Sequence, residues 1–200
     1  GGNNGGGNFS GSITSTNTVD LRINLVKNMT ISGSLNHFGT FTNDSGANSR
    51  NRGMTVSGVI GSNVTDIIMQ GGTPMHFTNS ANAYTGDTYV YSSQLRTTTT
   101  ITLPDTTEVH MFTGGVLNLN FTGTDTVAGL YFDNVEQSAG TWGRVGNGVS
   151  DYETAFIIGN GLLNVVPIPE PGAAGLLGLA GLGLLVRRRR RAQPQGTRPN

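Results

Sequence analysis

The chain has 200 residues, with 12 basic and 12 acidic side chains, 31 glycines and no cysteine, so its formal net charge is zero. The lack of cysteine excludes disulfides and thiolate metal sites. Half of the basic residues follow Val186, so the part before Pro169 is mildly acidic and has no basic patch with which to bind nucleic acid.

Short clusters of β-branched and aromatic residues, separated by Gly and Asn, indicate an all-β fold. Residues 1–8 read as a Gly/Asn-rich linker or an incomplete repeat, and the absence of a leader sequence before them favours a fragment of a longer protein. From Phe9 short strands recur. Val19, Leu21, Ile23 and Leu25 alternate with polar residues, which predicts a strand with one buried face.

The segment Asn82 to Thr88, with the sequence NAYTGDT, has the chemistry of a tight turn. Asn82 can hydrogen-bond its own backbone, Gly86 can supply a positive φ, and Tyr84 can pack across a rung. The segment resembles the autotransporter-associated β-strand repeat, although Ala83 and Asp87 depart from its pattern. The resemblance implies a right-handed parallel β-helix, or solenoid, over residues 9–166.

Two tyrosines follow this segment on one face of the next predicted strand, with Val90 on the other face. Tyr89 and Tyr91 are candidate carbohydrate contacts, because an aromatic pair can form a platform for a sugar ring. The alternative is stacking between neighbouring rungs, which we favour.

Further strands are expected over Thr97 to Leu103, where β-branched residues dominate, and over Val116 to Phe121, where apolar and polar residues alternate. A terminal block runs from Asp125 to Val165. Within it, Trp142 is expected to cover the end of the solenoid, which would otherwise offer unpaired strand edges.

No catalytic constellation is evident. His37, His76 and His110 lack metal-site spacing, and no G-x-S-x-G motif occurs. Carboxylate pairs occur at Asp105/Glu108 and Asp151/Glu153, but no motif holds either pair. We therefore predict that the protein is not an enzyme and has no catalytic, cofactor-binding or metal-binding residues.

The end of the chain has three consecutive parts. Pro169, Glu170 and Pro171 cannot continue a helix. Residues 172–186 are uncharged, predicting a short transmembrane helix of roughly 22 Å. A cluster of five arginines follows, which should stay cytoplasmic and place the preceding chain across the membrane: Arg187, Arg188, Arg189, Arg190 and Arg191.

This order resembles the PEP-CTERM sorting signal of Gram-negative bacteria over residues 167–191, with a disordered tail at 192–200. The resemblance implies processing by an exosortase, transient residence in the inner membrane, and release to the cell surface or extracellular matrix. An ordinary, uncleaved membrane anchor is the alternative for the same residues.

The leading hypothesis is a non-enzymatic, surface-delivered solenoid that acts as a spacer, an adhesin or a component of the biofilm matrix. The alternative keeps the fold and adds a polysaccharide ligand, as a carbohydrate-binding module or, less favoured, a polysaccharide-active β-helix enzyme.

Overall fold

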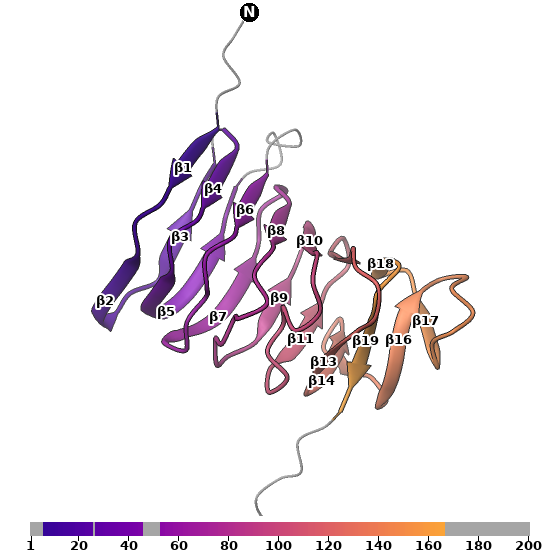
Figure 1. Ribbon diagram of the computed structural model, residues 1–200. Helices are drawn as coiled ribbons and strands as arrows, with labels where there is room; N and C mark the ends of the chain where they lie inside the picture. Colours follow the sequence, from indigo (N-terminus) through magenta and orange to yellow (C-terminus); the bar gives the residue numbers. More distant parts are fainter. Residues whose placement is uncertain (1–5, 26, 46–52, 167–200) are drawn as a thin grey trace, which may run out of the picture. The chain divides into compact units, whose positions relative to one another are not determined.

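The computed structural model describes residues 6–25, 27–45 and 53–166, and these form β-strands and connecting turns only (Figure 1). The strands are wound into a solenoid of about five turns, which confirms the all-β solenoid prediction. Within this described part, no helix is suited to crossing a bilayer. The predicted membrane helix, the sorting signal and the tail all lie outside the described residues.

Two sheets form the walls of the solenoid, and the chain passes from one to the other on each turn (Figure 1). The 7-stranded sheet is parallel throughout and contains, in spatial order, β1 (Gly7–Phe9), β4 (Met29–Ile31), β6 (Met54–Val56), β8 (Met75–Phe77), β10 (Gln94–Thr97), β12 (Val116–Leu119) and β18 (Ile157–Gly159). The first strand of the described solenoid is therefore β1, which begins at Gly7.

The 8-stranded sheet contains, from its far edge, β15 (Val135–Glu136), β14 (Gly129–Phe132), β11 (Glu108–Met111), β9 (Thr88–Val90), β7 (Val64–Met69), β5 (Leu35–Asn43) and β2 (Ile13–Thr18), and β3 (Leu21–Ile23) also pairs with β5. Its pairs are parallel except β14–β15. Parallel pairing across a whole coil places chemically equivalent positions of successive turns side by side.

Rows of apolar side chains in register fill the interior. Each wall contributes one row of buried side chains. The row of the 7-stranded sheet is Met54, Met75, Leu95 and Leu117, and the row of the 8-stranded sheet is Met69, Val90 and Met111. Burial of each such side chain contributes about 1.5–3 kcal/mol. These rows stabilise the coil without any disulfide.

The alternation predicted near the start of the chain is confirmed in part. Leu25 is buried, Leu21 and Ile23 are half-buried, and Arg22 between them is exposed. The prediction is wrong for Val19, because its side chain is 50% exposed where the chain turns between β2 and β3.

The predicted strand over Thr97 to Leu103 is also wrong after its first residue. β10 ends at Thr97, and Ile101 adopts a φ of 62° with its side chain exposed. The cause is the buried Asp125, whose carboxylate accepts hydrogen bonds from the backbone N–H groups of residues 101, 102 and 103 at 2.9–3.2 Å. These bonds hold a bend that β propensity alone would oppose.

The segment from Asn82 to Thr88 is a turn, but not for all the expected reasons. Gly86 does not have a positive φ; instead a Cβ there would overlap the carbonyl oxygen of Thr65 on the preceding rung. Asn82 bonds within its own turn and also reaches both neighbouring rungs. Tyr84 lies in the core as predicted, with its hydroxyl 2.7 Å from the Thr88 hydroxyl.

The C-terminal end of the solenoid is closed by a 4-stranded sheet of β13 (Thr124–Val127), β19 (Leu162–Val165), β16 (Gly140–Arg144) and β17 (Tyr152–Thr154). β16 runs antiparallel to β19, which breaks the parallel winding. Trp142 is 7% exposed, stacks on Tyr152 and meets Phe132 edge-on. The capping role predicted for Trp142 agrees with this packing.

Candidate functional site

The outer face of the 8-stranded sheet repeats its chemistry every 21 residues. Asp66, Asp87 and Glu108 occupy one position on three successive rungs. The Asp87 N–H donates to Asp66 Oδ1 at 2.9 Å, and the Glu108 N–H donates to Asp87 Oδ1, also at 2.9 Å. Each aspartate therefore joins its own rung to the next one.

Two residues further along the strands, the same face carries a stack of three rings, which we call the outer stack: Tyr89, His110 and Tyr131. They are register partners on β9, β11 and β14. The His110 ring lies 4.7 Å from the Tyr89 ring and 4.4 Å from the Tyr131 ring, with interplanar angles of 16° and 9°. Both faces of the imidazole are thus covered.

Tyr91 and Phe112 form a second stacked pair on the same face, with ring centroids 4.3 Å apart. Stacking between rungs, the interpretation favoured for Tyr89 and Tyr91, is therefore what the structure has. One face of each tyrosine lies against a ring of the next rung. Tyr91 is 37% exposed and keeps the larger accessible surface of the two.

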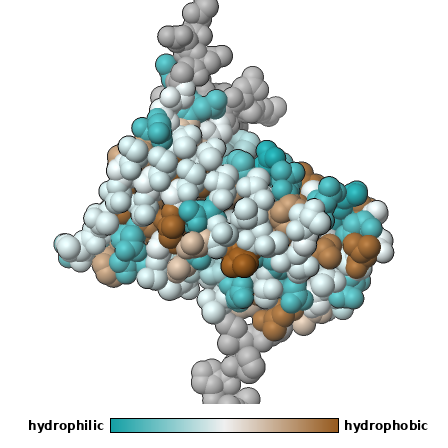
Figure 2. All heavy atoms as spheres, in the orientation of Figure 1, coloured by the Kyte–Doolittle hydropathy of each residue, from teal (hydrophilic) through white to brown (hydrophobic). Residues whose placement is uncertain are grey.

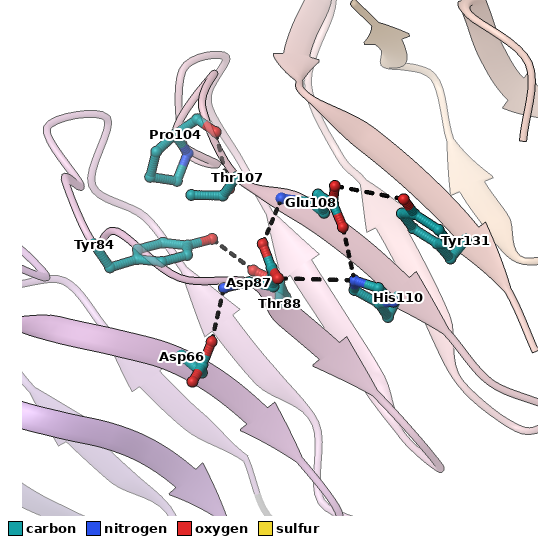
Figure 3. A network of polar contacts seen from close by, with 9 residues as sticks. All are labelled: Asp66, Tyr84, Asp87, Thr88, Pro104, Thr107, Glu108, His110 and Tyr131. Carbon is teal, nitrogen blue, oxygen red and sulfur yellow. Dashed lines mark hydrogen bonds and ion pairs between the residues drawn. The ribbon is translucent and has the colours of Figure 1, made fainter. Parts of the chain in front are cut away.

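His110 belongs to the outer stack and also faces two carboxylates; Figure 3 shows it with Asp87, Glu108 and Tyr131. Its Nε2 lies 3.3 Å from Glu108 Oε2 and 3.9 Å from Asp87 Oδ2, with hydrogen-bond geometry to neither oxygen. The Tyr131 hydroxyl donates to Glu108 Oε1 at 3.4 Å. Partial burial, and then the nearby carboxylates, raise the pKa values of the Tyr89 and Tyr131 phenols.

The other candidate residues from the sequence are not brought together. His37 is buried in β5 with its Nε2 2.9 Å from the Thr40 carbonyl, whereas His76 lies on β8 in the other sheet. Asp105 is exposed in a turn and forms no cluster with Glu108.

The second carboxylate pair supports loops of the C-terminal cap. Asp151 accepts hydrogen bonds from the N–H and hydroxyl of Thr141, and Glu153 accepts them from the N–H groups of Gly146 and Gly148. All these bonds lie at the surface. The two acids therefore serve local structure.

Sequence reasoning missed the association of Asp87, Glu108 and His110, because only Glu108 and His110 are close in the chain. A signal was present: acids at 66, 87 and 108 and rings at 89, 110 and 131 share the interval of 21 residues. Such an interval, combined with a solenoid prediction, places these side chains on neighbouring rungs.

Two hollows lie elsewhere in the described part of the chain. One, of about 520 Å³, is lined by residues 6–9, 23–25 and 27–29 at the first turn. The other, of about 420 Å³, contains His76 and Arg96, where burial and then the Arg96 charge lower the pKa of His76. Neither hollow has a carboxylate in its lining.

On the face seen in Figure 2, apolar side chains are scattered among polar ones and form no continuous patch.

Comparison with known proteins found no matching family model, no matching curated protein and no matching solved structure.

Proposed function

We propose that the chain is a non-enzymatic surface or extracellular-matrix protein, a right-handed β-solenoid delivered by a C-terminal PEP-CTERM-type signal. The observation that carries this proposal is the order of Pro-Glu-Pro, an uncharged segment of 15 residues and five arginines at 169–191. An exosortase removes the signal. The inner membrane is a transient partner of the precursor, and the mature protein resides outside the cell.

The position of the last strand supports processing at this point. β19 ends at Val165, and Pro169 follows in the sequence. Cleavage after the tripeptide would therefore leave in place every strand that the structure describes in the solenoid and the cap. The folded part would remain intact after release.

The source of the stability suits a spacer or matrix role. The walls are held by parallel backbone ladders and by core rows that repeat on each rung, so the coil depends on no disulfide. Each rung contacts mainly its neighbours, so such a coil can be extended by adding rungs without redesign of the core.

The delivery proposal is tested by replacing Pro169, Glu170 and Pro171 with alanine in a Gram-negative host that has an exosortase. We expect the unaltered protein at the surface with a mass lacking residues 172–200, and the variant uncleaved in the inner membrane. Replacement of Pro194 and Pro199 by alanine is the matched control and should leave cleavage unchanged. Full-length protein in both fractions, whether or not the tripeptide is altered, would favour a simple anchor.

Polysaccharide binding is a second candidate, favoured by the exposure of Tyr91, which stacks on Phe112 and is 37% exposed. A glycan array with the full-length protein tests it. Binding that is lost in Tyr91→Ala but retained in Tyr152→Ala, a similarly exposed tyrosine of the cap, would support a sugar-binding role. A spacer should bind nothing above background.

A further inference from the structure

The outer face of the 8-stranded sheet brings together three side chains of the types that ligate metal ions. Asp87 lies directly before β9, and Glu108 and His110 lie on the neighbouring strand β11 (Figure 3). One ligand atom from each, namely two carboxylate oxygens and an imidazole nitrogen, lies within 4.8 Å of the others.

The ligand atoms are spaced nearly as they would be around a tetrahedral ion, and the geometry at His110 Nε2 gives no hydrogen bond to either carboxylate. Zinc bonds to nitrogen and oxygen are about 2.0–2.2 Å long, so two ligands of a tetrahedral ion are roughly 3.3–3.5 Å apart. His110 Nε2 and Glu108 Oε2 are already 3.3 Å apart, and Asp87 Oδ2 is 3.9 Å from the same nitrogen. The Nε2 atom is buried and has no hydrogen-bond partner.

Contacts around the three side chains hold them in place for this arrangement. Asp87 Oδ1 accepts the Glu108 N–H, which leaves Asp87 Oδ2 towards His110. Glu108 Oε1 accepts the Tyr131 hydroxyl, which leaves Oε2 towards the same nitrogen. The imidazole is clamped between two rings and is only 15% exposed. Metal ligands are typically oriented by such outer contacts.

The charge of the cluster also calls for a cation. Asp87 and Glu108 carry two negative charges, and in the described part of the chain neither forms an ion pair with a lysine or arginine. Arg22, the one arginine there that forms an ion pair, contacts Asp44. The group that faces both carboxylates is the His110 imidazole, whose Nε2 can donate a lone pair to a metal ion.

We propose that Asp87, Glu108 and His110 bind one divalent transition-metal ion, for which Zn²⁺ is the probe. Imidazole favours zinc and its neighbours over calcium and magnesium, and a single carboxylate oxygen per acid suits a small ion. Binding requires Asp87 Oδ2, which lies 3.9 Å from His110 Nε2, to move closer to the other two ligand atoms. The ion joins two rungs of the solenoid and keeps its fourth position for water.

The test uses the full-length protein, purified without a histidine tag and kept in mild detergent. We expect isothermal titration calorimetry to show one Zn²⁺ per chain, and Ca²⁺ to bind at least about ten-fold more weakly. At a hundred-fold excess over the dissociation constant, Zn²⁺ should raise the melting temperature by roughly 5–10 °C. This readout does not depend on surface delivery, so it can fail independently of the proposed function.

Variants distinguish this site from binding elsewhere. His110→Phe keeps the ring stack and removes the nitrogen ligand, and Glu108→Gln keeps the shape and removes a charge. Each should weaken Zn²⁺ binding at least about ten-fold. The matched controls are Asp66→Asn, one rung earlier in the same row, and His76→Phe on the other sheet, and neither should change binding.

Circular dichroism of each variant first establishes that its β-structure is retained, and Glu108→Gln serves if His110→Phe does not fold. The proposal is overturned if Zn²⁺ does not bind, or if binding survives both ligand variants. It is also overturned if His76→Phe weakens binding as much as His110→Phe.

Discussion

Replacement of Asp125 by alanine should destabilise the solenoid strongly, although Asp125 is a buried acid. Its side chain is 1% exposed, and its carboxylate accepts the N–H groups of Ile101, Thr102 and Leu103. Burial raises the pKa of Asp125, and the hydrogen bonds from Leu103, Thr102, Ile101 and Thr126 oppose that rise. The variant removes the acceptor and leaves its donors behind.

The expected loss of stability follows from the N–H groups that lose their acceptor. Thr102 and Leu103 are fully buried, so water cannot replace the lost acceptor, whereas Ile101 is 62% exposed and its N–H can be hydrated. Each buried orphan N–H costs about 1–3 kcal/mol. The variant no longer buries a carboxylate, which offsets part of this loss, so we expect Asp125→Ala to lower the free energy of unfolding by about 2–4 kcal/mol. For a chain of this size that lowers the melting temperature by roughly 5–15 °C.

The assay is thermal unfolding of the full-length protein followed by far-UV circular dichroism, with amide hydrogen exchange at Thr102 and Leu103 as a second readout. Asp20→Ala is the matched control, since Asp20 also accepts the N–H of a residue on a neighbouring rung, Thr40, but at the surface. That variant should leave the melting temperature nearly unchanged. Equal melting temperatures for both variants would refute the reasoning.

Three further outcomes are expected. Gly86→Ala should lower the melting temperature, because the new Cβ overlaps the Thr65 carbonyl oxygen and overpacking costs about 1–3 kcal/mol; a neutral result would contradict the close approach. Trp142→Ala should cost about 3–5 kcal/mol and expose the cap to proteolysis; a variant cap that resists limited proteolysis as well as the unaltered one would contradict this. The hydrogen bond from the Gly146 N–H is the main cause that lowers the pKa of Glu153 below its usual 4.5. The contribution of Glu153 to the stability of this loop should therefore be present at neutral pH and be lost as the pH falls through the folded-state pKa. Hydrogen exchange at that amide measures this, and Glu153→Gln should abolish the pH dependence.

Much of the strand content could be predicted because alternation is a local property. Leu117 and Leu119 point inward and Asn118 does not, as the period of two requires, and Val90 lies opposite Tyr89 and Tyr91 for the same reason. The failures come where a distant group overrides local preference. Asp125, more than 20 residues further along the chain, holds the bend that follows Thr97.

Gly86 is a second position at which a contact with another rung, and not a local preference, requires the residue. The sequence indicates a glycine in a turn, and a positive φ is the usual local reason. The reason in the structure is the carbonyl oxygen of Thr65, which belongs to another rung.

The sequence by itself determined that this chain forms short strands with one apolar face, that it uses no disulfides, and that it carries a distinctive order of proline, apolar and arginine residues at its end. Only the tertiary structure decided which side chains meet on the outer face. Asp87 and His110 become neighbours because the winding of one full rung brings β11 beside β9 in a single register. That register depends on closing the intervening turns around a shared core, and no local pattern of residues contains this information.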